Sequence, residues 1–258
     1  MDALKKQYQD SKKFMARVEL NRRFGTNPYK WTLWVFDQIK FPENAKVLEL
    51  GCGNALLWKS NLDRIPEDAT ITLSDFSEGM LKDARKILGD AAERFEYKII
   101  DAQEILFPDG SFDIVIANYM LYHVPNRKKA ISEISRVLKN DGTFYTAAFG
   151  LNYMKELTDL VFNYNYEISY SLKPLALAFG LENGEEQLHN SFKDVKIRRY
   201  EDKLIVTEAE PLVNFVLSST NVIKEDMIKD FTEYVRAILD NYGKIEIKKN
   251  SGIFVATK

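Results

Sequence analysis

A glycine-containing turn follows the first strongly apolar run of the sequence. Residues 46–50 (KVLEL) are short and apolar, and residues 51–55 (GCGNA) come directly after them, before a helical pattern begins. Glycines at such a place let the backbone approach a ligand closely, and the first N–H groups of the helix point at that ligand. Because plain tight turns also contain Gly-x-Gly, this signal is weak by itself.

The turn lacks the further residues of two common nucleotide-binding motifs. A dinucleotide fingerprint requires a third glycine three residues after Gly53, where Leu56 stands. A phosphate-binding loop of the Walker type requires Gly-Lys-Ser/Thr, which does not follow. The pattern therefore argues against NAD, FAD and a Walker-type phosphate site.

Polar residues end three later apolar runs, where a parallel sheet would bring them to one edge. Asp75 follows the run 70–74, and a carboxylate there can hold both hydroxyls of a ribose. Asp101, Ala102 and Gln103 follow the run 95–100 and offer an acceptor and backbone groups to an adenine edge. Asn118 ends the run 112–117. One such residue is common in any sheet, but the ordered set predicts a nucleoside-binding edge.

His123 lies just beyond Asn118 and is the candidate general base, with Tyr122 beside it. An imidazole with its ordinary pKa near 6.5 suits that role. A histidine that only holds the loop is the competing interpretation. His189 falls on a solvated helical face, and Cys52 is interpreted as a small residue in a tight turn.

The elements that must position these residues alternate between strand and helix patterns. Strands are expected at 46–50, 70–75, 95–100, 112–117 and 143–149, and again at 195–206 and 244–258, the last with a turn at 250–252. Helices are expected after Ser77 (an N-cap), at 127–138 (ended by residues 140–142), within 151–190, at 209–218 and at 223–241. This alternation predicts a parallel sheet covered on both faces, with the last strands pairing antiparallel at its edge.

Composition narrows the class of protein. The 258 residues carry 36 Lys and Arg against 38 Asp and Glu, a net charge of -2, which gives no electrostatic footprint for nucleic acid. No apolar run approaches the roughly 20 residues that span a bilayer, and the charged N-terminus lacks a signal-peptide core, so a cytoplasmic protein is expected. One cysteine and two histidines exclude internal disulfides and a Cys/His zinc cluster.

Taken as an ordered set, the motifs resemble those of class I S-adenosylmethionine-dependent methyltransferases, in the branch with the ubiquinone/menaquinone-type and many small-molecule enzymes. The resemblance covers residues 46–149 and is carried by 47–53 (VLELGCG), 75–81 (DFSEGML), 101–103 (DAQ), 107–113 (FPDGSFD) and 136–142 (RVLKNDG). It implies a Rossmann-like α/β fold. We therefore expect a seven-stranded, mostly parallel sheet with an antiparallel edge strand, helices on both faces and a helical lid.

The resemblance also implies a role for each matched residue. S-adenosylmethionine would be bound and S-adenosylhomocysteine released, without a metal. Gly51 and Gly53 would line the methionine moiety, ordered by Glu49, and Asn118 would contact its amino end. Asp75 would bind the ribose. The adenine would be held by Phe76, Met80, Asp101, Ala102 and Gln103. Ala55 stands where the family often has a third glycine, so a slightly altered turn is expected.

Segments outside the matched core are expected to cover the acceptor. We expect an N-terminal helical lid at 1–40 and a methyltransferase domain at 41–258 with a helical insertion at about 151–190. The candidate lid and substrate residues are aromatic: Tyr29, Trp31, Trp34, Tyr153 and Tyr166. Because Tyr164, Tyr166 and Tyr170 cannot share one helical face, some of them should point into a cavity. The basic N-terminal helix is interpreted as a packed cap rather than a membrane anchor.

These expectations predict an S-adenosylmethionine-dependent methyltransferase (EC 2.1.1.-) that methylates a small molecule by in-line displacement. Nucleic acid and stable membrane association are not expected. Two alternatives stay open: a noncatalytic cofactor-binding regulatory partner, and a methyltransferase for a quinone or a protein. The acceptor, the methylated atom (O, N, S or C) and the oligomeric state are not predicted.

Overall fold

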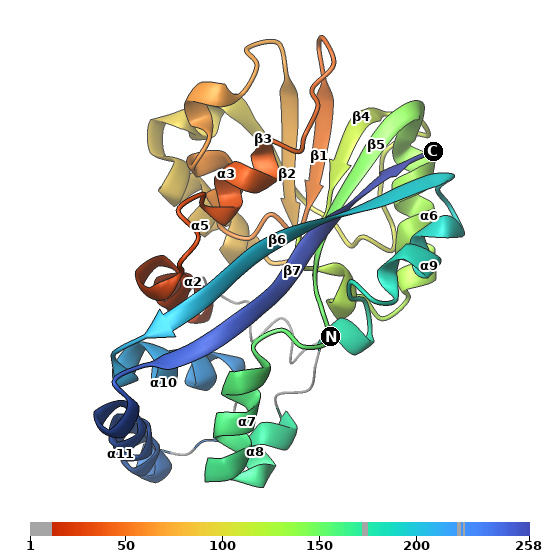
Figure 1. Cartoon of the computed structure of the whole chain (residues 1–258). Helices are drawn as coiled ribbons and strands as arrows, with labels where there is room; N and C mark the ends of the chain where they lie inside the picture. The colour runs from red at the N-terminus through yellow and green to blue at the C-terminus, as the bar shows by residue number, and fades with distance from the viewer. Residues whose placement is uncertain (1–11, 172–174, 221–222, 224) are drawn as a thin grey trace.

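Apolar strands alternate with amphipathic helices in the computed structural model, which describes residues 12–171, 175–220, 223 and 225–258 (Figure 1). The strands are β1 (Lys46–Leu50), β2 (Thr70–Asp75), β3 (Phe95–Ile99), β4 (Phe112–Ile116), β5 (Leu138–Phe149), β6 (Asp194–Val206) and β7 (Ile245–Thr257). The α-helices are α2 (Lys12–Phe24), α3 (Trp31–Phe36), α4 (Leu56–Lys59), α5 (Glu78–Leu88), α6 (Arg127–Val137), α7 (Lys155–Tyr164), α8 (Tyr166–Ser171), α9 (Gly184–His189), α10 (Ala209–Ser219) and α11 (Glu225–Tyr242). Short 3-10 turns are η1 (Leu62–Arg64), η2 (Gly89–Arg94), η3 (Leu121–His123) and η4 (Leu175–Leu177).

The seven strands form one sheet in the order β3-β2-β1-β4-β5-β7-β6. All neighbouring pairs from β3 to β5 are parallel, whereas β7 is antiparallel to both β5 and β6. The predicted seven-stranded, mostly parallel sheet is confirmed. The antiparallel strand lies one place inside the edge, and β6 forms the edge itself.

Two local boundaries differ from those that the sequence predicted. Residues 250–252 were expected to turn, but they lie inside β7, because the partner strands β5 and β6 pair with them on both sides. Residues 140–142 were expected to end a helix, but α6 already ends at Val137 and β5 begins at Leu138. At residues 250–252 sheet pairing overrides the local turn preference of Asn and Gly. At residues 140–142 the register with β4 shifts between the pairs Phe112–Leu138 and Ile114–Thr143, so this segment is an irregularity within β5.

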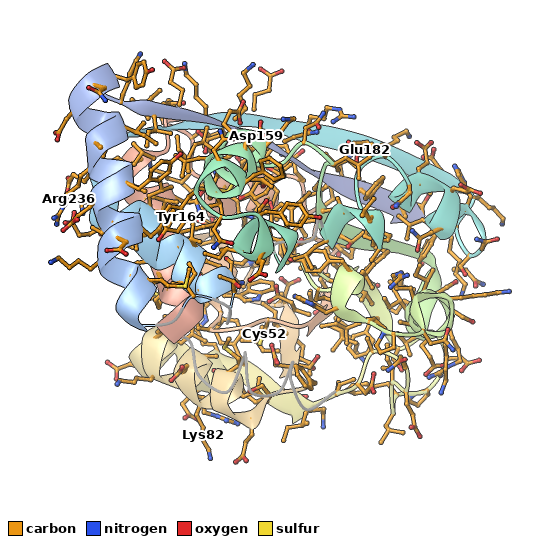
Figure 2. The ribbon with its side chains drawn as sticks, turned by 90° about the horizontal axis from the view of Figure 1, so that it is seen from below. Cys52, Lys82, Asp159, Tyr164, Glu182 and Arg236 are labelled. Carbon is orange, nitrogen blue, oxygen red and sulfur yellow. The ribbon has the colours of Figure 1, made fainter. Side chains whose placement is uncertain are left out.

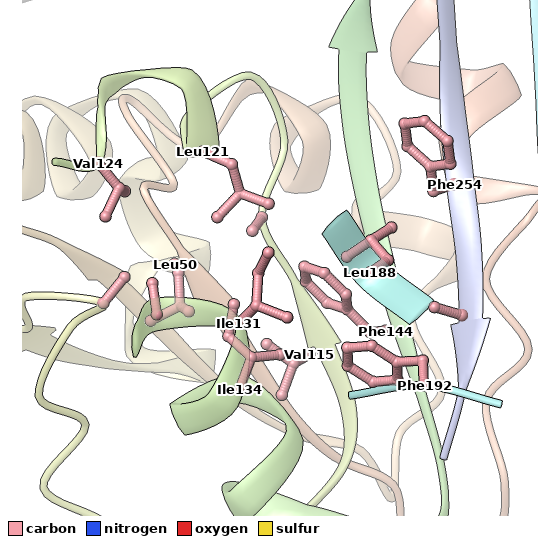
Figure 3. Close-up of a cluster of buried hydrophobic side chains, with 14 of the residues drawn as sticks. Leu50, Val115, Leu121, Val124, Ile131, Ile134, Phe144, Leu188, Phe192 and Phe254 are labelled. Atoms are coloured by element: carbon pink, nitrogen blue, oxygen red, sulfur yellow. The ribbon is translucent and has the colours of Figure 1, made fainter. Parts of the chain in front are cut away.

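Helices cover both faces of the sheet with separate apolar clusters. Helix α6 packs Ile131 and Ile134 against the strand residues Val115 and Phe144, and Leu188 of α9 joins this cluster (Figure 3). On the other face the cluster contains residues of α3, α4 and α5, namely Val35, Phe36, Leu57, Trp58, Leu81, Ala84 and Leu88. A sheet buried on both faces presents its strand ends, rather than its faces, to a ligand.

Strands β6 and β7 extend beyond the carboxyl end of β5 and carry a third apolar cluster. Phe149, the last residue of β5, pairs with Ser251, so residues 245–250 continue with 201–206 as a two-stranded ribbon. Helices α2, α7, α10 and α11 pack on this ribbon around a core that includes Leu20, Leu160, Leu212 and Phe231. This group of helices, which we call the cap, lies on the side of the sheet where the parallel strands end (Figure 1).

The segment after α2 is fastened to the ribbon by a buried carboxylate. Asp202 Oδ1 accepts hydrogen bonds from the backbone N–H of Thr26 (3.0 Å) and Asn27 (2.9 Å). Its Oδ2 accepts from Lys249 Nζ at 2.6 Å, and the two side chains are only 5% and 9% exposed. Gly25 also forms a β-bridge with Leu204. The end of α2 is therefore held at the edge strand.

Among the described helices none is long and apolar enough to cross a membrane.

We expect Asp202→Asn to lower the free energy of unfolding by about 3–5 kcal/mol, because it leaves the Lys249 ammonium buried without its counter-charge. Asparagine keeps an oxygen for Thr26 and Asn27, so the loss isolates the ion pair. Urea unfolding at fixed pH measures it. Lys196→Ala is the control, since its pair with Asp194 is 68% and 53% exposed and contributes at most about 1 kcal/mol. Equal losses in the two variants would contradict the role of Asp202.

Candidate functional site

The glycine turn that follows β1 has three residues in the left-handed backbone region. Gly51, Gly53 and Ala55 have φ of 67°, 56° and 61°. A Cβ at Gly53 would meet no atom within 4 Å, so open space lies above it. At Gly51 a Cβ would come within 3.0 Å of the Met120 side chain, so glycine is needed there. Ala55 thus takes the conformation of a third glycine, at a cost of about 1–2 kcal/mol.

Asp75 ends β2 and joins the turn to the next helix. Its Oδ2 accepts from Gly53 N (3.1 Å) and its Oδ1 from Ser77 N (2.9 Å). Ser77 in turn accepts from Met80 N, as predicted for the N-cap of α5. Burial raises the pKa of Asp75, while the N–H donors of Ser77 and Gly53 oppose that rise. With the Phe76 N–H as a third donor, the carboxylate still keeps part of its acceptor capacity for a ligand.

Glu49 lies beneath the turn and is 3% exposed. Its Oε2 accepts from Trp58 Nε1 at 2.6 Å. Burial raises the pKa of Glu49 to about 7; the Trp58 hydrogen bond opposes this and the Asp75 charge adds to it. Burial, and after it the charges of Glu49 and Asp75, raise the pKa of the Cys52 thiol well above its usual value. Cys52 is therefore no nucleophile. Among the described residues, no cation pairs with these acidic groups beneath the turn.

The end of β3 forms a small hydrogen-bonded cluster. Asp101 Oδ1 accepts from Gln103 N at 2.8 Å, and both Asp101 oxygens accept from Gln103 Nε2. Gln103 Oε1 accepts from Asn126 N, which ties the cluster to the start of α6.

The residues expected around the adenine differ in burial. Asp101 is exposed and Ala102 is buried. Phe76 is half-buried and Met80 buried at the start of α5. In the described ranges no three His, Cys, Asp or Glu side chains are grouped to hold a metal ion.

Asn118 follows β4 and faces β5. Its side-chain oxygen accepts from Ala147 N at 3.1 Å, which fixes the amide orientation. The side chain therefore offers an NH₂ donor. Because the side-chain oxygen of Asn118 is occupied, the main-chain carbonyl of Asn118 is the acceptor suited to the amino end of a ligand.

His123 lies in η3, and its basicity differs from the ordinary value that the sequence argument used. Burial, and after it the charge of Arg17, lowers the pKa of His123 to about 4. The imidazole is therefore neutral at pH 7 and a weak base. Its ring meets the edge of Tyr122, with centroids 4.5 Å apart. The sequence argument used the ordinary pKa near 6.5; burial, which disfavours the charged imidazolium, explains the difference.

An aromatic wall stands at the ends of β4 and β5. Tyr119, with φ of 54°, stacks on Phe149 at 4.3 Å and contacts Trp31 of α3 at 5.2 Å. Phe149 also stacks on Tyr122 (5.7 Å) and contacts Tyr153 (4.1 Å). Strain in a non-glycine backbone is typical of functional sites. The sequence singled out Trp31, Tyr122 and Tyr153. It missed Phe149, although Phe149 ends a predicted strand, as Asp75 does.

Tyr200 of β6 continues the wall toward the ribbon. It contacts Trp31 at 5.1 Å and Trp34 at 5.3 Å, and its hydroxyl donates to Tyr29 O at 2.6 Å. Burial raises the pKa of Tyr200 to about 12, and the Asp202 charge adds to the rise. No local sequence signal marks Tyr200, because its partners lie about 170 residues away. We call Trp31, Trp34, Tyr119, Tyr122, Phe149, Tyr153 and Tyr200 the aromatic wall.

Two expected substrate residues lie outside the wall. Tyr29 is 40% exposed, and Tyr166 is 61% exposed with its ring against Phe162. The argument that tyrosines two apart must diverge assumed one helix, but Asn165 ends α7 and its side chain accepts from the first N–H groups of α8. Tyr164 points into the cap against Phe231 of α11 (Figure 2). The side chain of Tyr170 lies outside the described residues.

A cavity of about 700 Å³ opens on the ribbon rather than at the glycine turn. Tyr200 and Ser251 line it together with charged side chains of β6, β7 and α7, among them Arg199, Asp202 and Lys248. None of the residues expected to bind the cofactor lines it. It therefore lies on the ribbon side of the aromatic wall.

Comparisons with known proteins agree with this geometry. A family model described as a methyltransferase domain matches residues 48–146. The sequence is 36% identical over 115 residues to a malonyl-[acyl-carrier protein] O-methyltransferase of Geobacter sulfurreducens, over 45% of this chain and 42% of the relative. It is 32% identical over 105 residues to a ubiquinone/menaquinone biosynthesis C-methyltransferase of Hydrogenovibrio crunogenus, over 40% and 41%. The chain contains a class I S-adenosylmethionine-dependent methyltransferase domain.

Solved structures of methyltransferases share the fold beyond this domain. A putative methyltransferase from Bacillus halodurans superposes with a TM-score of 0.58 at 19% identity, over 88% of this chain and 96% of that chain. Phosphoethanolamine N-methyltransferase 2 of Haemonchus contortus, in complex with S-adenosyl-L-methionine, gives 0.57 at 18% identity, over 95% and 56%. The chain spans less than half the length of the two curated relatives named above. For the methyltransferase domain, the resemblance carried by residues 46–149 and the fold class are thus confirmed.

We expect Glu49→Gln to change how stability depends on pH. A carboxyl whose pKa is raised from 4.5 to about 7 on folding stabilises the protein while protonated, and this contribution is lost as pH rises from about 4.5 to 7. Glutamine cannot ionise. The stability of the variant relative to the wild type, both without ligand, should therefore rise by up to about 3 kcal/mol between pH 4.5 and pH 8. Urea unfolding across this range measures it.

Glu43→Gln provides the control, because Glu43 is exposed in the loop before β1. Its unfolding curve should follow that of the wild type at every pH. Parallel pH profiles for Glu49→Gln and the wild type would contradict the raised pKa.

Proposed function

We propose that the protein is an S-adenosylmethionine-dependent methyltransferase that methylates a small-molecule acceptor. The observation that carries this proposal is the convergence of the glycine turn, Asp75 and the Asp101–Gln103 cluster at one sheet edge, facing the aromatic wall. The edge fits the cofactor: space is open above Gly53, and the buried Asn54 Oδ1 beside it has no partner among the described residues. The acidic groups beneath the turn suit a ligand that carries a sulfonium and an ammonium group.

Each strand end would hold one part of the cofactor. Gly51 and Gly53 would lie against the methionine moiety, with its ammonium group at the main-chain carbonyl of Asn118 and the Glu49 charge nearby. Asp75 would accept from the two ribose hydroxyls through its remaining lone pairs. Phe76, Met80, Asp101, Ala102 and Gln103 would surround the adenine.

The proposed methyl transfer requires little acid–base catalysis from this chain. When bound, S-adenosylmethionine supplies a methyl group already activated by its sulfonium. The protein's part is to align the acceptor in line with that methyl and to exclude water. The pKa of His123 is lowered, and burial raises the pKa of Tyr119 and of Tyr153. Accordingly we propose an acceptor atom that is nucleophilic without deprotonation at neutral pH, with His123 and Tyr122 orienting it.

The proposed partner is a small molecule, neither nucleic acid nor a membrane, in the cytoplasm. The near-neutral net charge supports this, and so does an aromatic wall that suits a partly apolar ligand. A noncatalytic cofactor-binding protein would share the site but not turnover. Formation of S-adenosylhomocysteine with an acceptor panel separates the two.

Asp75→Ala should weaken cofactor binding at least about tenfold, because hydrogen bonds from a carboxylate contribute about 1.5–3 kcal/mol each. Isothermal titration calorimetry with S-adenosylhomocysteine measures the affinity. Asp90→Ala is the control, since Asp90 is exposed in η2. Wild-type affinity in Asp75→Ala would remove Asp75 from the site, and no binding by the wild type would refute the proposed function.

Removing residues 1–22 should leave cofactor affinity within a few-fold of the full chain while lowering turnover at least about tenfold, because α2 covers the turn: Asn54 Nδ2 lies 3.4 Å from Met15 Sδ. Since buried Leu20 is lost as well, thermal unfolding is measured alongside. Trp31→Ala tests the same lid without truncation. Full turnover in both variants would show that the lid does not act in transfer.

A further inference from the structure

Among the described residues, Arg17 is the arginine of α2 that forms no ion pair. Arg22 and Arg23, on the same helix, form ion pairs with Glu19 and Glu208. Arg17 instead donates from Nε to Ser218 Oγ (3.2 Å) and from Nη2 to Ser218 O (2.8 Å). In the described part of the chain no carboxylate lies within ion-pair distance of it, although Arg17 is half-buried.

Helix α2, which carries Arg17, lies against the glycine turn. Met15, two residues earlier, contacts Asn54 of the glycine turn. Burial lowers the pKa of His123 and the charge of Arg17 adds to this, whereas burial raises the pKa of Tyr153 and the charge of Arg17 opposes that rise. These two residues belong to different loops, one after β4 and one after β5. Tyr153 is part of the aromatic wall, and the His123 ring contacts Tyr122 of that wall. The guanidinium therefore acts on the space above the strand ends from the cap side.

The fork of Arg17 is held in a fixed orientation. Ser218 lies in the last turn of α10, where unpaired carbonyls carry partial negative charge that offsets the guanidinium without neutralising it. The Nε and Nη2 atoms of Arg17 donate hydrogen bonds to Ser218. Nη1 has no hydrogen-bond partner among the described residues. A half-buried, oriented guanidinium without a counter-ion is costly in an unliganded protein, and its planar donors match carboxylate and phosphate oxygens.

We infer that Arg17 recognises an anionic group, a carboxylate or a phosphate, on the methyl acceptor. This inference rests on the proposed function and adds the acceptor's charge to it. Arg17 would be a specificity residue: it binds a group distinct from the methylated atom and so places that atom before the aromatic wall. Neutral His123 beside it can share the anion through a hydrogen bond without a charge of its own.

The test titrates two probes, inorganic phosphate and malonate, into the protein saturated with S-adenosylhomocysteine. The readouts are the NMR signals of the Arg17 Nε–H and of the His123 ring. We expect a saturable shift of both signals at millimolar probe with at least one of the two anions. Arg17→Gln should weaken the anion response of the His123 signal at least tenfold, whereas Arg22→Gln, on the same helix, should leave it unchanged. The stronger probe identifies the class of anion.

Arg17→Lys keeps the charge but loses the planar fork, so its response should lie between those of wild type and Arg17→Gln. The pKa of His123 should rise above about 4 in Arg17→Gln, which checks that the two groups are close. The overturning results are an unchanged His123 response in Arg17→Gln, or no response of the wild type to either probe. Failure to bind S-adenosylhomocysteine refutes the proposed function instead, and the anion titration of the free protein then still decides the role of Arg17.

Discussion

The Asp75 carboxylate is the interaction on which the candidate site depends. Parallel strands bring several chain segments to one edge, but the segments that follow them need partners of their own. Asp75 supplies them by accepting from Gly53 after β1 and from Ser77 before α5. A buried carboxylate is tolerated only with such donors. The same side chain therefore fixes the open turn and keeps acceptor capacity for a ligand.

The ribbon of β6 and β7 provides the second constraint, because it carries the cap past the end of the sheet. The Asp202–Lys249 pair fastens the end of α2 there, and Tyr200 on the same strand packs against Trp31 and Trp34. Helix α2 is thereby held close to the glycine turn. The lid residues and the strand-end residues are positioned by one continuous set of contacts, although they are far apart in the chain.

The sequence predicted what local patterns determine. Strand positions, the N-cap Ser77 and the strand-end polar residues follow from apolar periodicity and from short-range hydrogen bonding. It did not reveal the contacts of Asp202 with Thr26, of Tyr200 with Trp31 or of Arg17 with Ser218, because each joins segments more than 160 residues apart. The lowered pKa of His123 was missed for a related reason, because burial and the charge of Arg17, a residue distant in the sequence, arise only in the folded chain.

The two charged regions of the site are of opposite sign and lie on opposite sides of the space above the strands. Glu49 and Asp75 lie beneath the glycine turn, and both have raised pKa values, chiefly because burial disfavours their charge. Arg17 lies on the cap side without a carboxylate partner among the described residues. A cationic ligand against the turn would relieve the first imbalance, and an anionic group under the cap the second. Because each region repels the ligand that suits the other, this arrangement would seat a positively charged methyl donor and a negatively charged acceptor in one relative order, with the aromatic wall beside the point where they meet.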